Sequence, residues 1–281
     1  MNDVGPSAAK PFATLLLTGA AGALGQSLAP ALSCLCTRLL LSDLGGPLAA
    51  TPLPARAEAA PCDLGDPVAV HQLLQGVDAV VHLGGVSVER PFEEVLPANI
   101  RGVFHLYEAA RRHGTRRIVF ASSNHVTGCY DKAQTVSPQD PPRPDGYYGL
   151  SKLYGEGMAS LYWDRYGIET VCLRIGSALP QPRDHRGLYT WLSLPDLARL
   201  VTAALTAPDV GFVVAYGISN NTRRWWDTEA AWARLHYSPQ DDSEVYAAQV
   251  QHVRQPEGSP SALKQGGVFL AVGPFDDHPP D

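Results

Sequence analysis

The stretch "ATLLLTGAAGALG" (residues 13–25) joins a strongly apolar run to a turn of small residues. "ATLLLT" predicts a buried strand, and the apolar pattern that continues through Leu35 predicts a helix after the turn. Gly19, Gly22 and Gly25 occupy that turn. The first glycine permits a tight turn, the second lets a pyrophosphate approach the backbone, and the third lets helix and strand pack closely. A plain small-residue turn is the alternative, but the strand–turn–helix context favours a dinucleotide-binding loop.

Further apolar runs continue the alternation of strand and helix. They span residues 38–43, 78–85, 116–123, 169–177 and 211–217, with helical segments between most of them. Near-continuous apolar strands predict a parallel sheet covered on both faces, which is a doubly wound α/β (Rossmann) fold.

The chain shows no internal repeat and no long linker, so we expect a single domain over residues 1–281. Residues 12–177 are expected to be mainly the dinucleotide-binding core, and residues 178–281 mainly a substrate-covering part. Beyond Leu235 the sequence becomes polar and proline-rich, and the last residues, "DDHPPD" (276–281), are expected to fray.

Two helix boundaries are readable from the sequence. "NIRGVFHLYEAARRHG" (99–114) ends in Arg111, Arg112 and His113 before Gly114, which is typical of a cationic last turn and a glycine cap rather than of a binding patch. In "SLPD" (193–196), Ser193 is predicted to cap a helix that has proline in its first turn.

Composition excludes several classes of function. With 281 residues, 45% hydrophobic and 18% charged, the chain is long and apolar enough to bury a core. A net charge of −6 argues against a nucleic-acid partner. No apolar run approaches the ~18 residues that span a bilayer, and no secretory pattern opens the chain, so a cytoplasmic protein is expected.

The cysteines favour reduced thiols. There are five, scattered along the chain, and an odd number suits a reducing compartment. Cys34 and Cys36 form the only close pair and have no His or Cys partners at zinc-like spacing, so no metal is expected.

Two acidic residues follow predicted strands of the dinucleotide half. Asp43 lies 18 residues after Gly25, near the spacing expected of an acid that holds the adenosine ribose hydroxyls. A carboxylate there repels a 2′-phosphate, and Leu44 and its neighbours supply no cation, so NAD is favoured over NADP. Asp63 could accept from the adenine amino group, although a surface-turn aspartate is nearly as good an interpretation.

"DGYYGLSK" (145–152) places Tyr148 and Lys152 four residues apart, on one face of a helix. A free phenol has a pKa near ~10. We expect the Lys152 ammonium and the positive nicotinamide ring to lower the pKa of Tyr148, so that it acts as the base for a hydroxyl proton. Taken alone, a tyrosine and a lysine at this spacing are more often an exposed pair on an ordinary helix. The dinucleotide loop upstream favours a catalytic pair instead.

"FASSNHVTGCY" (120–130) ends an apolar run with four polar residues, Ser122 to His125. These residues suit either an ordinary turn or a row of groups directed at a polar ligand.

"TGAAGALG", then "SS" after a strand, then "YGLSK" resemble the extended short-chain dehydrogenase/reductase superfamily over residues ~12–235. The resemblance implies that Ser123, Tyr148 and Lys152 are catalytic, and that Asn99 supports the proton relay. The superfamily also contains nucleotide-sugar epimerases and dehydratases, so the fold does not fix the substrate.

A finer pattern is similar to bacterial uronate dehydrogenases. It is carried by "VHLGGVSVERPFE" (81–93), "RPDGYYGLSK" (143–152), "LRIGS" (173–177) and "HRGLYTW" (185–191), together with the polar row. Those enzymes use NAD to oxidise the anomeric hydroxyl of cyclic galacturonate or glucuronate to an aldarolactone. The resemblance implies a small uronic acid substrate and a homo-oligomer.

The resemblance also implies the site residues, and it turns the polar row into a sugar-binding edge. The sugar would contact Ser87, Ser123, Asn124, His125 and Ser177, with Arg186 on its carboxylate. The NAD site, beyond Gly19 and Gly25 of the loop, would be lined by Gly22, Ala23, Leu24, Asp43, Leu44, Asp63, Leu64, Leu83, Gly84, Gly85, Ile175, Tyr148 and Lys152.

Some alternatives stay open. Arg183 competes with Arg186 for the carboxylate, whereas Arg174 lies within a strand and is interpreted as structural. Trp225 and Trp226 would cover the sugar or pack in the core. An epimerase or dehydratase would need a larger C-terminal part, and a non-catalytic dinucleotide sensor would be expected to lose the tyrosine or the lysine.

Overall fold

In the computed structural model, which describes residues 10–273, seven parallel strands form one sheet in the order β3-β2-β1-β4-β5-β6-β9. The strands are β1 (Phe12–Thr18), β2 (Cys36–Ser42), β3 (Ala57–Ala59), β4 (Ala79–His82), β5 (Arg117–Ser123), β6 (Glu169–Ile175) and β9 (Phe212–Gly217). The order reverses between β1 and β4, the place where ligands bind in such sheets. Two short strands, β7 (Ser177–Ala178) and β8 (Trp191–Leu192), pair separately.

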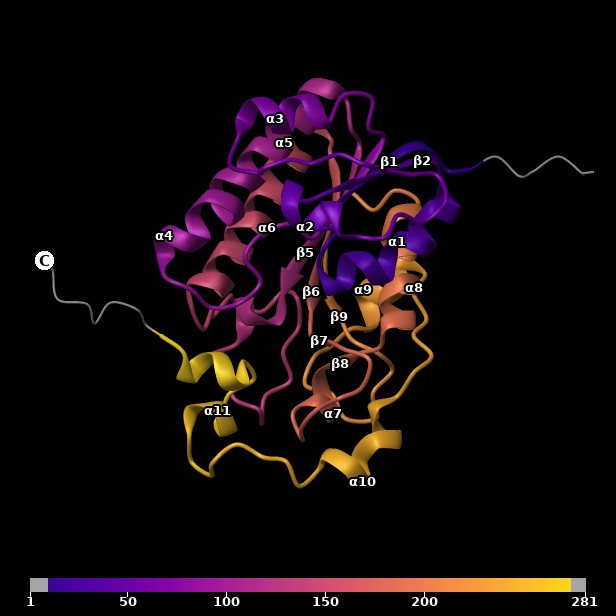
Figure 1. Cartoon of the computed structure of the whole chain (residues 1–281). Helices are drawn as coiled ribbons and strands as arrows, with labels where there is room; N and C mark the ends of the chain where they lie inside the picture. The colour runs from indigo at the N-terminus through magenta and orange to yellow at the C-terminus, as the bar shows by residue number, and fades with distance from the viewer. Residues whose placement is uncertain (1–9, 274–281) are drawn as a thin grey trace, which may run out of the picture.

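Helices cover both faces of the sheet (Figure 1). One face carries α3 (Pro67–Leu73), α5 (Gly102–His113) and α6 (Tyr147–Tyr166), and the other carries α1 (Ala23–Leu35), α8 (Leu194–Thr206) and α9 (Glu229–Leu235). Leu15 and Leu17 pack in one hydrophobic cluster and Leu16 in the other, because successive side chains of β1 point to opposite faces. The doubly wound fold predicted from the sequence is confirmed.

Short elements gather at the carboxyl edge of the sheet and around its margins. They are α2 (Gly45–Ala49), α4 (Phe92–Val95), α7 (Gly187–Thr190), α10 (Ala247–Val250) and α11 (Pro260–Leu263), the π-helix η1 (Leu96–Arg101), and the 3-10 helices η2 (Asn124–Thr127), η3 (Ser243–Tyr246) and η4 (Gly267–Ala271). Figure 1 shows α7, α10 and α11 below the sheet. Residues 276–281, predicted to fray, lie outside the described residues.

Both predicted helix boundaries are found. Gly114 ends α5 with φ +76°, and Ser193 caps α8 by accepting a hydrogen bond from the Asp196 backbone N–H. The helix predicted over residues 99–114 differs at its start, where η1 precedes α5. The strand β9 and helix α8 come from the later part of the chain, so residues 178–281 also complete the core.

Trp225 and Trp226 are buried and lie in the hydrophobic core. Trp226 stacks on Tyr216 with ring centres 4.8 Å apart, and Trp225 stacks on Tyr189 at 4.6 Å. Neither tryptophan lines the large cleft described below, so of the two interpretations the structure favours core packing.

Within residues 10–273, no helix is long and apolar enough to cross a membrane. The same part of the chain contains no group of three or more His, Cys, Asp or Glu side chains arranged to hold a metal ion. All five cysteines are free thiols.

Candidate active site

A cleft of about 850 Å³ opens at the carboxyl edge of the sheet. Except for Asn99, which does not line it, the cleft is lined by every residue assigned from the motifs and the resemblance: Gly19, Gly22, Ala23, Leu24, Gly25, Asp43, Leu44, Asp63, Leu64, Leu83, Gly84, Gly85, Ser87, Ser123, Asn124, His125, Tyr148, Lys152, Ile175, Ser177 and Arg186. The structure therefore brings together residues that are spread over most of the chain, and their individual roles stay predictions.

The glycine-rich turn has the geometry that a pyrophosphate needs. Gly19 has φ +69°, and a Cβ built on Gly25 would lie 2.3 Å from the Gly19 carbonyl oxygen, so α1 packs directly on the turn. The α1 N-terminus has no side-chain cap and no acid in its first turn. Its first N–H groups are therefore available to an anion, and the helix dipole favours one.

The two acids of the dinucleotide half are held by backbone N–H groups. The carboxylate of Asp43 accepts from Ala21 N at 2.9 Å and from Leu44 N at 2.8 Å, which fixes it beside the glycine-rich turn. Asp63 accepts from Gly65 N at 2.8 Å, the geometry of a local turn, while still lining the cleft. Both interpretations of Asp63 are compatible with its position.

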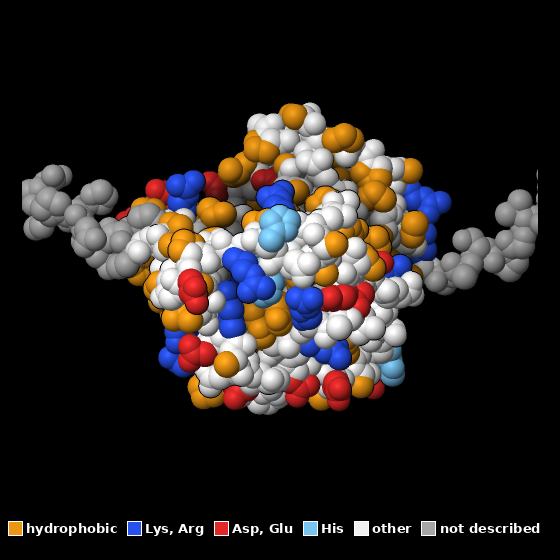
Figure 2. All heavy atoms as spheres, turned by 90° about the horizontal axis from the view of Figure 1, so that it is seen from below, with side chains coloured by type: hydrophobic (Ala, Val, Ile, Leu, Met, Phe, Trp, Pro, Cys, Tyr) orange, Lys and Arg blue, Asp and Glu red, His pale blue; other side chains and the backbone are white. Residues whose placement is uncertain are grey.

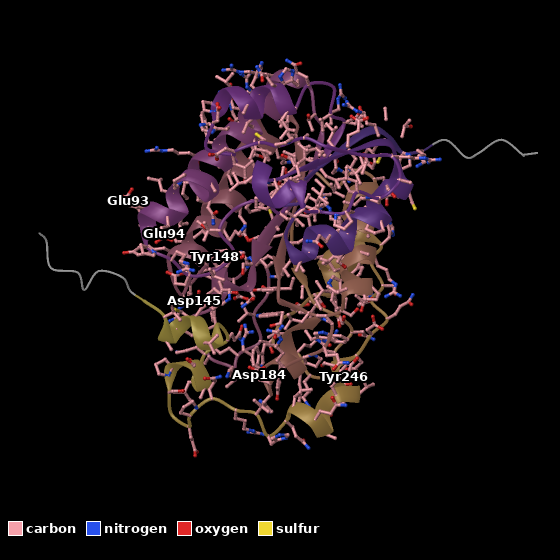
Figure 3. All side chains as sticks on the ribbon, viewed as in Figure 1. Glu93, Glu94, Asp145, Tyr148, Asp184 and Tyr246 are labelled. Carbon is pink, nitrogen blue, oxygen red and sulfur yellow. The ribbon has the colours of Figure 1, made fainter. Side chains whose placement is uncertain are left out.

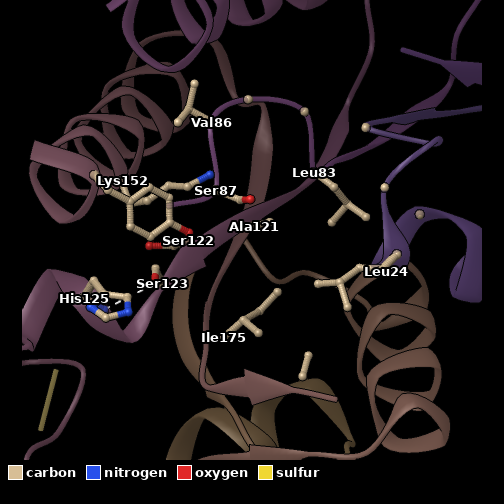
Figure 4. A pocket seen from close by; sticks show the side chains of 18 of the residues that line it. Leu24, Leu83, Val86, Ser87, Ala121, Ser122, Ser123, His125, Lys152 and Ile175 are labelled. Carbon is tan, nitrogen blue, oxygen red and sulfur yellow. Dashed lines mark hydrogen bonds between the residues drawn. The ribbon is translucent and has the colours of Figure 1, made fainter. Parts of the chain in front are cut away.

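Tyr148 and Lys152 are buried on one face of α6. Ser123, at the end of β5, lies near enough to Tyr148 to lower the pKa of the phenol, and Lys152 Nζ lies 5.6 Å from the centre of the Tyr148 ring. Figure 4 shows Lys152, Ser87 and Ser123 gathered on one side of the cleft, with Leu24 and Ile175 across from them. Burial lowers the pKa of Lys152 to about 8.

For the protein groups alone the pKa of Tyr148 shifts upward, and the lowering predicted for Lys152 together with the nicotinamide ring stays a prediction. Burial of the phenol is the largest effect and raises the pKa of Tyr148 to about 12. The hydrogen bond from Ser123 opposes this rise, whereas the nearby Asp145 carboxylate adds to it. The desolvation of an ionisable hydroxyl outweighs its one favourable hydrogen bond.

Asn99 connects two segments of the chain by hydrogen bonds. Its side chain accepts from Val86 N at 2.8 Å and donates to Val86 O and to Ser151 Oγ, each at 2.9 Å. Ser151 in turn donates to the Tyr148 carbonyl oxygen. Asn99 therefore ties the loop after β4 to α6, and its hydrogen bonds do not reach the Tyr148 or Lys152 side chains.

The four polar residues at the end of β5 and just beyond it, Ser122 to His125, all line the cleft. Ser122 is in addition tied to the core, because it donates to Glu156 at 2.6 Å, and Glu156 forms a buried ion pair with Arg174 at 2.8 Å. Arg174 is structural, as its place within a strand predicted.

Arg186 is held in the cleft by several acceptors. Its Nε donates to Gln265 O at 2.8 Å and its Nη1 to Ser177 Oγ at 3.1 Å. With the Asn124 amide oriented so that its oxygen faces Arg186, Nη2 donates to it at 2.9 Å. Arg183 also lines the cleft but is exposed, whereas Arg186 is half-buried, and the assignment of the carboxylate to Arg186 stays a prediction.

Other residues of the site were not predicted from the sequence. Gly266, Val268 and Phe269 line the cleft from the C-terminal part. Glu89 accepts from Tyr147 N at 2.8 Å and from Tyr148 N at 2.9 Å, so it caps the helix that carries the predicted base. Glu89 lies within "VHLGGVSVERPFE" (81–93), but nothing in that stretch indicated a cap on α6, and no motif marked residues 266–269.

Comparisons with known proteins agree with this geometry. The model of the NAD dependent epimerase/dehydratase family matches residues 15–184, and the chain belongs to this family. It is 54% identical over 268 residues to the uronate dehydrogenase of Pseudomonas syringae pv. tomato, a match that covers 95% of this chain and 96% of that protein.

Solved structures give the same result. The crystal structure of glucuronic acid dehydrogenase from Chromohalobacter salexigens matches with a TM-score of 0.90 and 45% identity, covering 95% of this chain and 99% of that one. A mutant of uronate dehydrogenase from Agrobacterium tumefaciens, complexed with NAD, matches with a TM-score of 0.88 and 41% identity over 94% and 99%. The resemblance to uronate dehydrogenases predicted from the motifs is confirmed.

Proposed function

We propose that this chain is an NAD-dependent uronate dehydrogenase, which oxidises the anomeric C1 hydroxyl of a cyclic uronic acid to the aldarolactone. One observation carries the proposal. Arg186, oriented by Ser177 and Asn124, shares a cleft with the Tyr148–Ser123 pair. Asn124 and Ser123 are neighbours in the chain, so the guanidinium proposed to bind the carboxylate and the phenol proposed to take the hydroxyl proton interact with adjacent residues at one edge of the sheet.

The dinucleotide end of the cleft fits NAD. The uncapped α1 N-terminus would hold the pyrophosphate, and Asp43 would hold the adenosine ribose. Lys152 would bind the nicotinamide ribose. When bound, NAD supplies the acceptor for the hydride that leaves C1.

The protein's own groups bind and orient the sugar and remove its proton. Arg186 offers a planar fork of donors, which suits the uronate carboxylate. Ser87 and Ser177, together with Asn124 and His125, offer donors and acceptors to the ring hydroxyls. Tyr148 takes the C1 hydroxyl proton, and the Ser123 hydrogen bond stabilises the phenolate that must form.

Local charge at the substrate end favours an anion although the chain as a whole carries −6. Figure 2 shows Lys and Arg side chains gathered near the middle of the lower face. Burial lowers the pKa of His185, and Arg254, Arg223 and Lys132 lower it further, whereas Asp184 raises it; the charges of Lys132 and Arg186 also interact. Cations near Arg186 would attract a uronate to this end of the cleft.

The substrate enters as a closed ring, so the first product is a lactone, and its later hydrolysis needs no group of this site. We further propose that one domain does this work, with residues 178–281 supplying the substrate end, and that the protein is a cytoplasmic homo-oligomer without nucleic-acid or membrane partners.

The test is NADH absorbance with a panel of uronic acids and neutral sugars. Galacturonate and glucuronate should give net NADH, whereas an epimerase returns its hydride and accumulates none, and a silent sensor turns nothing over. Tyr148→Phe should remove nearly all kcat while NAD binding, measured by fluorescence, persists. Turnover by that variant at wild-type rates would refute the assignment of the base.

A further inference from the structure

A buried carboxylate lies directly behind one of the sugar-facing residues. Asp145 Oδ2 is 2.7 Å from His125 Nδ1, and the Asp145 side chain is 0% exposed. Figure 3 places Asp145 beside Tyr148 at the start of α6. Asp145 begins the "DGYYGLSK" stretch, but no role in the site was predicted for it from the sequence.

The chain makes room for this pair at three glycines. A Cβ built on Gly128 would lie 1.8 Å from Asp145 Oδ2, and one built on Gly266 would lie 1.9 Å from it. A Cβ on Gly149 would lie 2.4 Å from the His125 carbonyl oxygen. Three separate segments therefore meet around the pair without side chains, and the carboxylate has no space to swing away.

The His125 ring is fixed in two ways. It stacks on Phe269 with ring centres 3.8 Å apart and an interplanar angle of 15°, and it meets the Tyr148 ring edge-on at 5.8 Å. Stacking sets the plane of the imidazole, and the bond to Asp145 sets its direction within that plane. Because Nδ1 is engaged and the ring lines the cleft, Nε2 is the atom left for a ligand.

We propose that Asp145 is a positioning residue that keeps the His125 proton on Nδ1, so that Nε2 accepts a hydrogen bond from one hydroxyl of the sugar. This inference rests on the proposed function, because the hydroxyl belongs to the uronate. An ionised carboxylate can only accept, so the hydrogen between the two residues must belong to Nδ1. In a neutral imidazole the other nitrogen is then an acceptor.

A purely structural role would not need a carboxylate here. Asp145 Oδ1 is buried without a hydrogen-bond partner among residues 10–273, and an unpaired buried acceptor is costly. The same charge adds to the rise in the pKa of Tyr148 and so opposes the phenolate that the reaction needs. An asparagine would tie the two segments together without the charge that opposes the phenolate, whereas only a carboxylate, which cannot donate, imposes one tautomer on His125.

The direct test is the tautomer itself. Two-bond ¹⁵N–¹H correlation spectra of the enzyme labelled with ¹⁵N-histidine, with His125 assigned by its loss in His125→Gln, should show Nδ1 protonated and Nε2 unprotonated at pH 8. A protonated Nε2 would overturn the proposal. This readout needs no turnover, so it stands or falls separately from the proposed function.

The second test uses the substrate. The test substrates are uronates in which one hydroxyl at a time is replaced by fluorine or by hydrogen. Neither replacement can donate a hydrogen bond to His125. Replacing the hydroxyl that faces His125 should therefore lower kcat/KM about tenfold in either series. In Asp145→Asn and in His125→Ala that cost should disappear, while in Asp196→Asn, a buried carboxylate outside the cleft, it should persist. A cost that persists in Asp145→Asn refutes the positioning role. Failure of the wild type to oxidise any uronate refutes the function instead.

Discussion

Replacing Arg186 with alanine should separate recognition of the acid from the chemistry at C1. The guanidinium is half-buried and already held by Gln265 O, Ser177 Oγ and the Asn124 amide, so it is ordered before substrate arrives. Burial lowers the pKa of Arg186, because the cation has lost contact with water. A carboxylate bound there would lose its own hydration and would depend on the Arg186 guanidinium for compensating hydrogen bonds.

The magnitude follows from what the variant leaves behind. Removing one partner of a buried hydrogen-bonded charge pair costs ~2–5 kcal/mol, which is roughly 30- to 5,000-fold in kcat/KM for a uronate. A neutral sugar such as galactose has no carboxylate to lose, so its slow turnover should change little. The exposed Arg183 is the matched control, and Arg183→Ala should cost under ~1 kcal/mol.

The assay is initial NADH production with galacturonate and with galactose, for both variants and the wild type, alongside thermal unfolding to check the fold. The expected signature is loss of the preference for the acid in Arg186→Ala alone. The reasoning is refuted if Arg186→Ala keeps the wild-type preference, or if Arg183→Ala loses it.

Three further variants test other contacts. Asp43→Asn should weaken catalysis with NAD by roughly tenfold or more, because a charged acceptor of the ribose is lost, and should raise the NADP/NAD ratio of kcat/KM; an unchanged ratio would contradict the assignment. Glu89→Gln should lower the free energy of unfolding by about 1 kcal/mol, since two α6 N–H groups lose a charged cap, whereas the exposed Glu93→Gln should not when both are measured by urea unfolding. Because burial lowers the pKa of Lys152 to about 8, the unfolded chain binds its proton more tightly between pH 8 and 10. The free energy of unfolding should therefore rise with pH in that window relative to Lys152→Met, and parallel pH profiles would contradict this.

The features that the sequence predicted well are those set by local spacing. The glycine-rich turn, the Tyr148–Lys152 pair and the caps at Gly114 and Ser193 each depend on residues within one or two helical turns. The parallel sheet covered on both faces followed from the alternation of apolar runs and helices. Local geometry restricts such features so strongly that few residues suffice to predict them.

The features that the sequence did not predict depend on distant segments. Phe269 reaches the cleft only because the last described residues fold back on the turn after β5. Glu89 lies in the loop after β4, and it caps α6 only because the fold brings that loop to the start of the helix. The depth at which Tyr148 is buried, and therefore the direction of its pKa shift, depends on all of these segments together.

The fold-back of residues 265–269 has a consequence for how the two ends of the cleft depend on each other. Gln265 O accepts from Arg186, Gly266 N donates to Gly128 O and Phe269 stacks on His125, so this one segment supports the residues proposed to hold the sugar. Loosening it would therefore disable sugar binding while leaving the glycine-rich turn and Asp43, which it does not support, ready for the dinucleotide.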